Sequence, residues 1–355
     1  MISNIQLNSY ITNKHKRNYV IPINDTIYND YYDYNTIIYD CFLSPKNDEL
    51  FIIRPPLLNL KKFYSIKQII FNNKVYKYVN LKISERCDTL CVKIDANNTL
   101  HDNILKIIFI NDEVFECKLS KNNLSNSKNT IITMQKDNKL IWIKDWIEHY
   151  VKNFNIDRVI IYDNNSSYQK SLCNYLMENF KNSNLEIVLV FWNFKYGDNA
   201  AIHGNKFSRH GFINHALNKF KNKNILYQFD IDELAMCKDR EYFDSLSDGV
   251  YYLNSFNVKN IPNNKLNNLK YTFKDYTIIH SESVDGIWKY IIKNYEKFNI
   301  GTNHYINNCR NKVFVDKNKL YFLHYNGITN FWHKTSKREL IHHIRKANIK
   351  MKIKK

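Results

Sequence analysis

Short apolar runs separated by polar turns fill the first 125 residues, and none of them has a helical period of useful length. The strands that this pattern predicts are TIIYDCFL, LFIIR, IKQIIF, KVYKYVNLKI, LCVKID, ILKIIFI and VFECKL. IKQIIF and KVYKYV form a predicted hairpin, because Asn72 and Asn73 between them tolerate the left-handed backbone of a tight turn. Residues 1–125 are therefore predicted to form a smaller β-rich, sandwich-like domain.

The pattern changes after the polar segment 118–129, which is the predicted linker. Strands then alternate with amphipathic helices. The predicted strands are TIITMQ, DRVIIYD, LEIVLVFW and ILYQFDID, and the predicted helices are IWIKDWIEHYVKNF, SLCNYLMENF and FINHALNKF. Repeats of this kind predict an α/β domain over residues 126–334, with a mixed, mainly parallel sheet flanked by helices.

Two of these strands end in polar side chains, at residues 163–166 and 230–233. Ligands of such sheets bind at the carboxyl ends of the strands. Asp230 and Asp232 face the same side of an extended strand unless the chain turns between them. Two carboxylates held close together are costly unless a cation bridges them, and Mn²⁺ or Mg²⁺ with oxygen ligands would serve. A solvated strand end or a helix N-cap is the structural alternative, and Glu233 is either a supporting group or the start of the next turn.

The stretch WIKDWIEHYVKNFNIDRVIIYDNNSS resembles the opening of the DUF23/family-92 type of glycosyltransferases, with its W-I-E-Y/H-H helix and a strand ending in Y-D-N-N-S. FDIDEL, about 65 residues later, is similar to that family's D-I-D-E-F segment. SRHGFINHALNKF, WKYIIKN and LHYNG resemble three further segments. The resemblance covers about residues 130–330.

This resemblance implies a GT-A fold and a metal-dependent, inverting transferase that uses a nucleotide sugar, with a UDP-sugar favoured and a GDP-sugar as the alternative. Asp163 and Asn165 would lie near the base and ribose of the nucleotide. Asp230 and Asp232 would hold the metal, and His324 would complete its coordination. The acceptor would be a glycan or a glycoprotein.

Two departures from the family pattern leave the nucleotide and the sugar open. Tyr168 stands where an acidic residue is usual, and Arg209-His210 stand where Gln is expected. Arg209 is therefore a candidate contact of the nucleotide sugar. Lys289 is a candidate contact of phosphate, although in so basic a chain a solvated lysine is the commoner state.

Glycosyl transfer also needs a general base beside the acceptor hydroxyl. The segment HSESVDGIWKY offers Glu282 and Asp285, of which Asp285 is preferred, although Asp285-Gly286 is also an obvious turn pair. In the N-terminal domain, Tyr31-Tyr32-Asp33-Tyr34 is a candidate for stacking on sugar rings, while a tyrosine-rich surface is also simply common in a chain of this composition.

The net charge of +18 raises the question of nucleic-acid binding. The lysines are scattered, however, and the abundance of Asn, Lys, Ile and Tyr is typical of an AT-rich genome, so no specific nucleic acid is expected. Residues 335–355 are predicted to form a basic C-terminal helix or tail, which is either solvated or in peripheral contact with an anionic membrane.

Seven cysteines at irregular spacing show no zinc pattern and predict reduced thiols. With no apolar segment at the N-terminus that is typical of a signal peptide, the expected localisation is cytoplasmic, in a host cell if the protein is viral. The alternative function from another class is a non-catalytic carbohydrate-binding or scaffold protein on a transferase fold. The sequence leaves the oligomeric state open.

Overall fold

The computed structural model describes residues 2–18, 32–82, 86–95, 102–120, 127–196, 206–258, 272–275, 279–298, 301–302, 304–306, 313–325 and 328. The side chains at 279–287 are outside this description, as are the predicted basic tail 335–355 and residues 121–126 of the predicted linker 118–129. Within the described residues, no helix is both long and apolar enough to cross a membrane.

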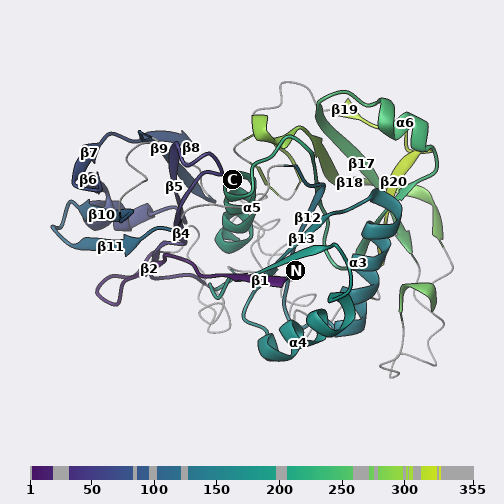
Figure 1. The fold of residues 1–355 in the computed structure, drawn as a ribbon, viewed down its shortest axis with the longest axis horizontal. Helices are drawn as coiled ribbons and strands as arrows, with labels where there is room; N and C mark the ends of the chain where they lie inside the picture. Colours follow the sequence, from purple (N-terminus) through teal and green to yellow (C-terminus); the bar gives the residue numbers. More distant parts are fainter. Residues whose placement is uncertain are drawn as a thin grey trace, which may run out of the picture.

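A ten-stranded sheet forms the centre of the larger domain (Figure 1). Its path runs β1 (Ile2–Ile5), β14 (Glu186–Phe191), β13 (Arg158–Asp163), β12 (Thr130–Gln135), β15 (Ile225–Gln228), β18 (Ile279–Lys293), β17 (Gly249–Val258), β20 (Leu320–Tyr325) and β16 (Glu233–Cys237), and β19 (Val313–Phe314) pairs with β17. The first five strands are mutually parallel, whereas β18 and β16 run antiparallel to their neighbours. The parallel half therefore gathers the carboxyl ends of β12, β13 and β15 at one edge.

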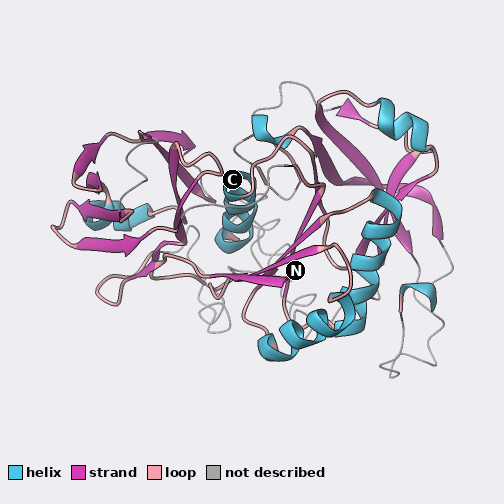
Figure 2. Cartoon of the chain, viewed as in Figure 1, coloured by secondary structure: helices cyan, strands magenta, loops and turns pink. Residues whose placement is uncertain are grey.

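Helices cover both faces of the parallel half because its strands are apolar on both sides. In β13, Val159 and Ile161 pack in the core with α3 (Leu140–Phe154) and α4 (Gln169–Phe180). Ile160 and Tyr162 face the opposite core, with α5 (Phe207–Lys219). A shorter helix, α6 (Arg240–Ser245), follows β16. Figure 2 shows these helices around the larger sheet.

The N-terminal domain is a sandwich of two four-stranded sheets beside the larger sheet (Figure 1). One sheet has the order β4 (Asp40–Leu43), β5 (Glu49–Arg54), β9 (Asp88–Lys93) and β8 (Val79–Lys82). The other has the order β11 (Val114–Lys118), β10 (Ile104–Phe109), β6 (Ile66–Phe71) and β7 (Lys74–Tyr76). The pair β2 (Tyr10–Ile11) and β3 (Thr36–Ile38) and the short helices η1 (Leu58–Leu60) and α2 (Lys61–Tyr64) complete the described elements of this domain.

The expected fold class is confirmed: a mixed, mainly parallel sheet flanked by helices, together with a smaller β-rich domain. The predicted hairpin is also present, with Asn72 and Asn73 at positive φ between β6 and β7. One strand lies outside its predicted domain, because β1 joins the larger sheet by pairing in parallel with β14. The predicted strand ILYQFDID is shorter than expected and ends at Gln228.

The proposed stacking role of the tyrosines at 31–34 is not supported by Tyr32, which is fully buried in the core next to Phe207. Tyr34 packs edge-on against Tyr32 at a centroid distance of 5.0 Å, and Tyr31 lies outside the described residues. Burial of an aromatic ring removes the face that a sugar would contact. Tyr32 therefore serves packing between the two domains.

Candidate active site

The acidic turn, which we define as residues 230–233, follows β15 at the carboxyl edge of the parallel strands. The backbone N–H of Glu233 donates to the carbonyl oxygen of Asp230 at 3.0 Å. The N–H of Asp230 in turn donates to Oε2 of Glu233 at 2.8 Å. The chain therefore turns between Asp230 and Asp232, and Glu233 opens the next strand, β16. Because of this turn, the two aspartates have different partners.

Side chains of helix α3 hold the acidic turn in place through hydrogen bonds to the backbone of the turn. The indole N–H of Trp146 donates to the carbonyl oxygen of Asp230 at 3.0 Å. The hydroxyl of Tyr150, one helical turn further on, donates to the carbonyl oxygen of Glu233 and accepts from the N–H of Ala235, both at 3.0 Å. The WIEHY segment of the helix and the DIDE turn, far apart in sequence, thus form one structural unit.

Two cations meet at the carboxylate of Asp230. Nη2 of Arg209, from α5, lies 2.6 Å from Oδ2, and Nζ of Lys289, from β18, lies 2.8 Å from the same atom. Lys289 also lies 2.8 Å from Oε2 of Glu233, and its side chain is only 1% exposed. The expectation of a solvated lysine is therefore wrong, because Lys289 is neutralised by two carboxylates in the interior.

These contacts fix the charge of the cluster. Burial alone would raise the pKa of Asp230, but the neighbouring Arg209 and Lys289 charges outweigh it and hold this pKa well below its ordinary value. In Glu233, burial raises the pKa, and the nearby carboxylates of Asp230 and Asp232 add to this effect against the charge of Lys289. Asp230 is consequently an ionised anchor for two cations.

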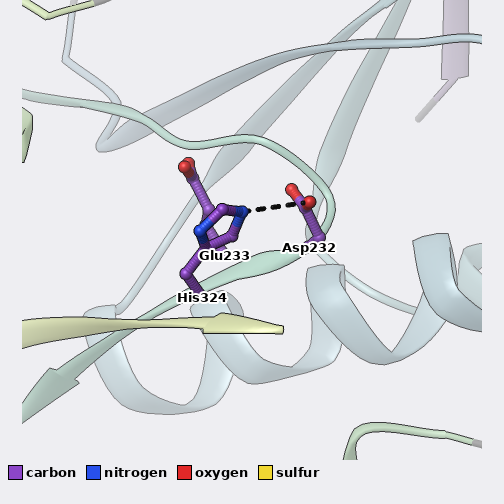
Figure 3. Close-up of side chains that lie close together, drawn as sticks. All are labelled: Asp232, Glu233 and His324. Atoms are coloured by element: carbon purple, nitrogen blue, oxygen red, sulfur yellow. Dashed lines mark ion pairs between the residues drawn. The ribbon is translucent and has the colours of Figure 1, made fainter. Parts of the chain in front are cut away.

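Asp232 lies instead beside His324 (Figure 3). Nε2 of His324 is 3.3 Å from Oδ2 of Asp232, and His324 is the direct cross-strand neighbour of Glu233 in the β16–β20 pair. One ligand atom of each of Asp232, Glu233 and His324 lies within 4.8 Å of the others. The structure thus brings together an aspartate from the acidic turn and a glutamate and a histidine from the adjacent strands β16 and β20.

Two of these three residues, Asp232 and His324, are suitably placed to bind a divalent cation. The side chains of Asp232 and His324 are 27% and 22% exposed, so both are accessible to an ion. Nδ1 of His324 is buried and has no hydrogen-bond partner. Burial alone would lower the pKa of His324, but its hydrogen bond to Asp232 and the charge of that carboxylate raise it to about 9. Glu233 is less available, because its Oε2 already binds Lys289 and the Asp230 N–H.

Asp163 ends β13 and is fully buried. Its carboxylate accepts from the backbone N–H of Ser166 at 2.9 Å and from the Gln169 amide at 2.7 Å, and the Gln135 amide contacts it as well. This side chain therefore shapes the loop after β13. Asn165, by contrast, is exposed and has a left-handed φ of 60°, so a ligand can reach its side chain.

Glu282 and Asp285 both lie in β18, but their side chains are outside the described residues. The backbone register shows where they are. Asn254 pairs with Trp288, whereas the next residue of β17, Ser255, pairs with Val284. Residues 285–287 therefore interrupt the regular pairing of β18 with β17. Asp285 lies in this irregular segment, four residues before Lys289.

Sequence reasoning missed the part that Trp146 and Tyr150 play, and it left Glu233 without a partner. The apolar stripe of α3 indicated only that these aromatic residues face the core. The polar atom that each carries was the available signal, because a buried indole N–H or phenol hydroxyl requires a hydrogen-bond partner.

No protein-family model and no curated protein sequence matches the chain. Among solved structures, the apo structure of the bifunctional glycosyltransferase WbbM is similar over 40% of this chain and 27% of its own, at 17% identity and a TM-score of 0.28. A putative glucose-1-phosphate thymidylyltransferase from Bacillus anthracis, in complex with a sucrose, shares 12% identity over 38% of this chain and 56% of its own, with a TM-score of 0.27.

The mannosyltransferase Ktr4p from S. cerevisiae is 10% identical over 38% of this chain and 41% of its own, with a TM-score of 0.25. The chain thus spans between about a quarter and just over half of the length of these proteins. They are glycosyl- and nucleotidyltransferases, and the likeness is too weak for any of them to assign a function to this chain.

Proposed function

We propose that this protein is a metal-dependent glycosyltransferase that transfers a sugar from a nucleotide-sugar donor to a hydroxyl group of a glycan or glycoprotein, with inversion. The observation on which this rests is the acidic turn: Asp232 beside His324, and Asp230 beside Arg209 and Lys289, at the carboxyl edge of a parallel sheet. The resemblance of the WIEHY, YDNNS and DIDE segments to family-92 glycosyltransferases supports it. A UDP-sugar is the favoured donor and a GDP-sugar the alternative.

Arg209 and Lys289 would bind the diphosphate of the donor. Asp230 fixes both side chains in advance through a shared carboxylate oxygen, so little side-chain freedom is lost when an anion arrives. A guanidinium and an ammonium group form charge-assisted hydrogen bonds to phosphate oxygens. Placed in a partly buried site, they would stabilise the negative charge that develops on the leaving diphosphate.

Asp232 and His324 would hold the divalent cation, Mn²⁺ or Mg²⁺. Asp230 would lie beside the ion and would hold Arg209 and Lys289 in place instead of serving as a main metal ligand. When bound, such an ion supplies further positive charge to the leaving group. Glu233 would position the cluster, because it links the Asp230 backbone and Lys289. Asn165 would lie beside the nucleoside, with Asp163 shaping its loop.

Deprotonation of the acceptor hydroxyl is assigned to Asp285, with Glu282 as the alternative. Both belong to the strand that carries Lys289, so a base from this segment would reach the donor from the side of the diphosphate cations. Exchange of each for its amide, followed by assay of sugar transfer, distinguishes them, since the true base loses turnover and keeps donor binding.

The decisive experiment is isothermal titration of the full chain with UDP- and GDP-sugars, with and without Mn²⁺. Binding of one nucleotide sugar that requires Mn²⁺ and is lost in Asp232→Asn supports the proposal. The matched control is Asp244→Asn, which removes a carboxylate from an exposed ion pair on α6 and leaves binding intact.

Two results would contradict the proposal. Absence of binding to every nucleotide sugar by a folded chain would exclude a transferase and favour the carbohydrate-binding alternative. Binding that does not require Mn²⁺ and survives in Asp232→Asn would exclude the metal and leave Arg209 and Lys289 as the whole anion site.

A further inference from the structure

Exposed aromatic side chains gather at one place on the larger domain. The sequence contains 21 Phe and 26 Tyr residues. Of the Phe, Tyr and Trp residues that the structure describes, Phe314 and Tyr305 are the most exposed, at 46% and 36%. Trp288, which is partly exposed, contacts Phe314 edge-on at a centroid distance of 5.8 Å. Single exposed apolar residues are common, whereas clustered ones indicate a binding surface.

Contacts with neighbouring residues hold these rings in fixed positions. The ring of Phe314, on β19, packs against Tyr252 of β17 at a centroid distance of 5.6 Å. The hydroxyl of Tyr252 accepts from the backbone N–H of Ile306 at 3.2 Å. The indole N–H of Trp288 donates to the carbonyl oxygen of His304 at 2.7 Å, and Nδ1–H of His304 donates to the carbonyl oxygen of Trp288 at 2.9 Å. Rings that are exposed and already immobilised lose little freedom when a ligand binds.

The segment that carries Tyr305 is fixed to the same part of the fold. Gly301 and Ile306 form an antiparallel bridge, and the N–H of Thr302 donates to the carbonyl oxygen of Tyr305 at 2.8 Å. The amide of Asn214, on α5, donates to the carbonyl oxygen of Gly301 at 3.1 Å and accepts from its N–H at 3.0 Å. This segment is therefore bound to α5 as well as to β17 and β18. We call Trp288, Tyr305 and Phe314 the aromatic shelf.

The register of the sheet places Trp288 level with the acidic turn. Gln228, the last residue of β15, pairs with Tyr290 of the antiparallel strand β18. Trp288 therefore lies two residues beyond this pair, in the direction in which β15 leads to Asp230. The residue after Trp288 is Lys289, whose Nζ lies 2.8 Å from Oδ2 of Asp230. The aromatic shelf is thus continuous with the cations of the proposed donor site.

Side-chain alternation along β18 puts the aromatic shelf on the face of the sheet that α5 covers. Trp288 and Tyr290 pack in the core that includes α5, whereas Ile291 belongs to the opposite core. Arg209, which binds Asp230, is also part of α5. A ligand on the shelf would therefore lie on the Arg209 side of the donor diphosphate.

We propose that the aromatic shelf binds a sugar ring of the acceptor, and that the acceptor is an oligosaccharide of β-linked glucose or N-acetylglucosamine. This inference rests on the proposed transferase function and names its substrate class. The ring substituents of these sugars are equatorial, so that axial C–H groups form a flat apolar face. Such a face packs on an aromatic ring, whose negative π-surface attracts the C–H hydrogens. Continuity with the donor cations favours this occupant over a second copy of the chain.

The test is saturation-transfer difference NMR of the full chain with cellotetraose and with chitotetraose, without any nucleotide sugar. This measurement detects weak binding and reports which ligand protons touch the protein. The expected result is saturation of ring C–H protons in at least one of the two oligosaccharides. Phe314→Ser should weaken this binding about five- to tenfold, and Phe314→Tyr, which keeps the ring, should retain it. Val114→Ser removes an apolar side chain of β11 that is 52% exposed and should leave binding unchanged.

Titration of the same preparations with UDP- and GDP-sugars and Mn²⁺ separates this inference from the transferase proposal. Nucleotide-sugar binding without binding of either oligosaccharide, or with oligosaccharide binding that Phe314→Ser leaves unchanged, would overturn the aromatic shelf alone. Oligosaccharide binding that depends on Phe314, in a chain that binds no nucleotide sugar, would overturn the acceptor role and favour the carbohydrate-binding alternative. A dimer in sedimentation velocity that dissociates in Phe314→Ser would assign the shelf to a second copy of the chain and overturn the proposal.

Discussion

Two clusters in this chain each pair an aspartate with a histidine, and the two pairs differ in their access to solvent. In the domain contact, which we define as Asp40, His215, Lys219 and Tyr162, the carboxylate of Asp40 lies 2.8 Å from Nε2 of His215 and 2.9 Å from Nζ of Lys219. Asp40 and His215 are fully buried. Asp232 of the acidic turn and His324 of β20 form a looser pair at 3.3 Å, and both remain partly exposed.

The partners of the two histidines show what this difference means. Nδ1 of His215 is paired with the hydroxyl of Tyr162 at 2.6 Å, whereas Nδ1 of His324 is buried without a partner. The second oxygen of Asp40 accepts from the backbone N–H of Asn8 at 2.7 Å. The domain contact is thus complete within the protein, while the acidic turn has binding capacity left. An aspartate and a histidine side by side indicate a ligand site only when access and an unused polar atom accompany them.

The largest effect is expected from Asp40→Asn. It leaves Lys219 and His215 without their carboxylate, and breaking a buried ion pair costs about 3 kcal/mol or more of the free energy of unfolding. Urea unfolding measures this change. Asp112→Asn, which removes the partner of Lys67 in an exposed pair, provides the control and is expected to change stability by no more than about 0.5 kcal/mol. Equal effects of the two variants would remove the proposed distinction between the clusters.

Asp232→Asn is expected to reduce the binding of Mn²⁺ and to leave the stability of the fold nearly unchanged. The affinity for Mn²⁺ should fall by about 100-fold, because one of two accessible ligands loses its charge. The free energy of unfolding should change by less than about 1 kcal/mol, since Asp232 has a single partly exposed ion pair. Calorimetric titration with Mn²⁺ and urea unfolding of the same preparation measure both quantities. A variant that loses stability and keeps its Mn²⁺ affinity would make Asp232 a structural residue.

Acid should weaken the domain contact. Burial, together with the nearby charge of Lys219, lowers the pKa of His215 to about 4, against the opposing effect of the hydrogen bond that its Nε2–H donates to the carboxylate of Asp40. His215 therefore stays neutral in the folded chain while the unfolded chain takes up a proton below its ordinary pKa of 6.5. The free energy of unfolding falls as the pH falls from about 6.5 towards 4, by at most about 1.4 kcal/mol per pH unit for this one group.

Urea unfolding as a function of pH tests this, with His215→Gln as the reference. Buried His210 has its pKa lowered to about 3 and titrates in an overlapping range, so the informative quantity is the difference in slope between the two chains. The variant should have the shallower slope between pH 6.5 and 4. Parallel slopes would show that His215 does not contribute.

The smallest effect is expected from Trp146→Phe, which removes the indole N–H that holds the acidic turn. The loss of one of the two hydrogen bonds that the carbonyl oxygen of Asp230 accepts should cost about 1 kcal/mol of the free energy of unfolding. Because the turn also places Asp232, Mn²⁺ affinity should fall by several-fold in the same variant. A change of stability alone would mean that α3 supports the fold without positioning the site.

The fold was predictable where the pattern of apolar and polar residues favours a single type of element. The apolar runs at 130–135 and 158–163 are buried on both faces and became β12 and β13. Three features needed tertiary contacts and were not predictable from local pattern. The strand ILYQFDID stops early because Glu233 closes a turn with Asp230, Lys289 is buried because two carboxylates neutralise it, and β1 finds its partner β14 far along the chain.

The sequence predicted which residues lie in the site, but it did not predict which of them pair with one another. Asp230, Asp232, Arg209, Lys289 and His324 were all singled out, and the structure gathers them around one turn. The sequence could not show that Asp230 pairs with the two cations while Asp232 pairs with the histidine. That division depends on the four-residue turn 230–233, which the periodicity of the sequence does not predict.

The two hydrogen-bonding side chains of α3 allow the acidic turn to tolerate changes of sequence during evolution. Trp146 and Tyr150 bind carbonyl oxygens of the acidic turn, which every amino acid possesses, and they make no demand on the carboxylates. Both acids could therefore be exchanged during evolution while the loop kept its shape. If the proposed function holds, a descendant could lose turnover in one or two steps and keep the backbone of the acidic turn, so active enzymes and inactive relatives are expected on this scaffold.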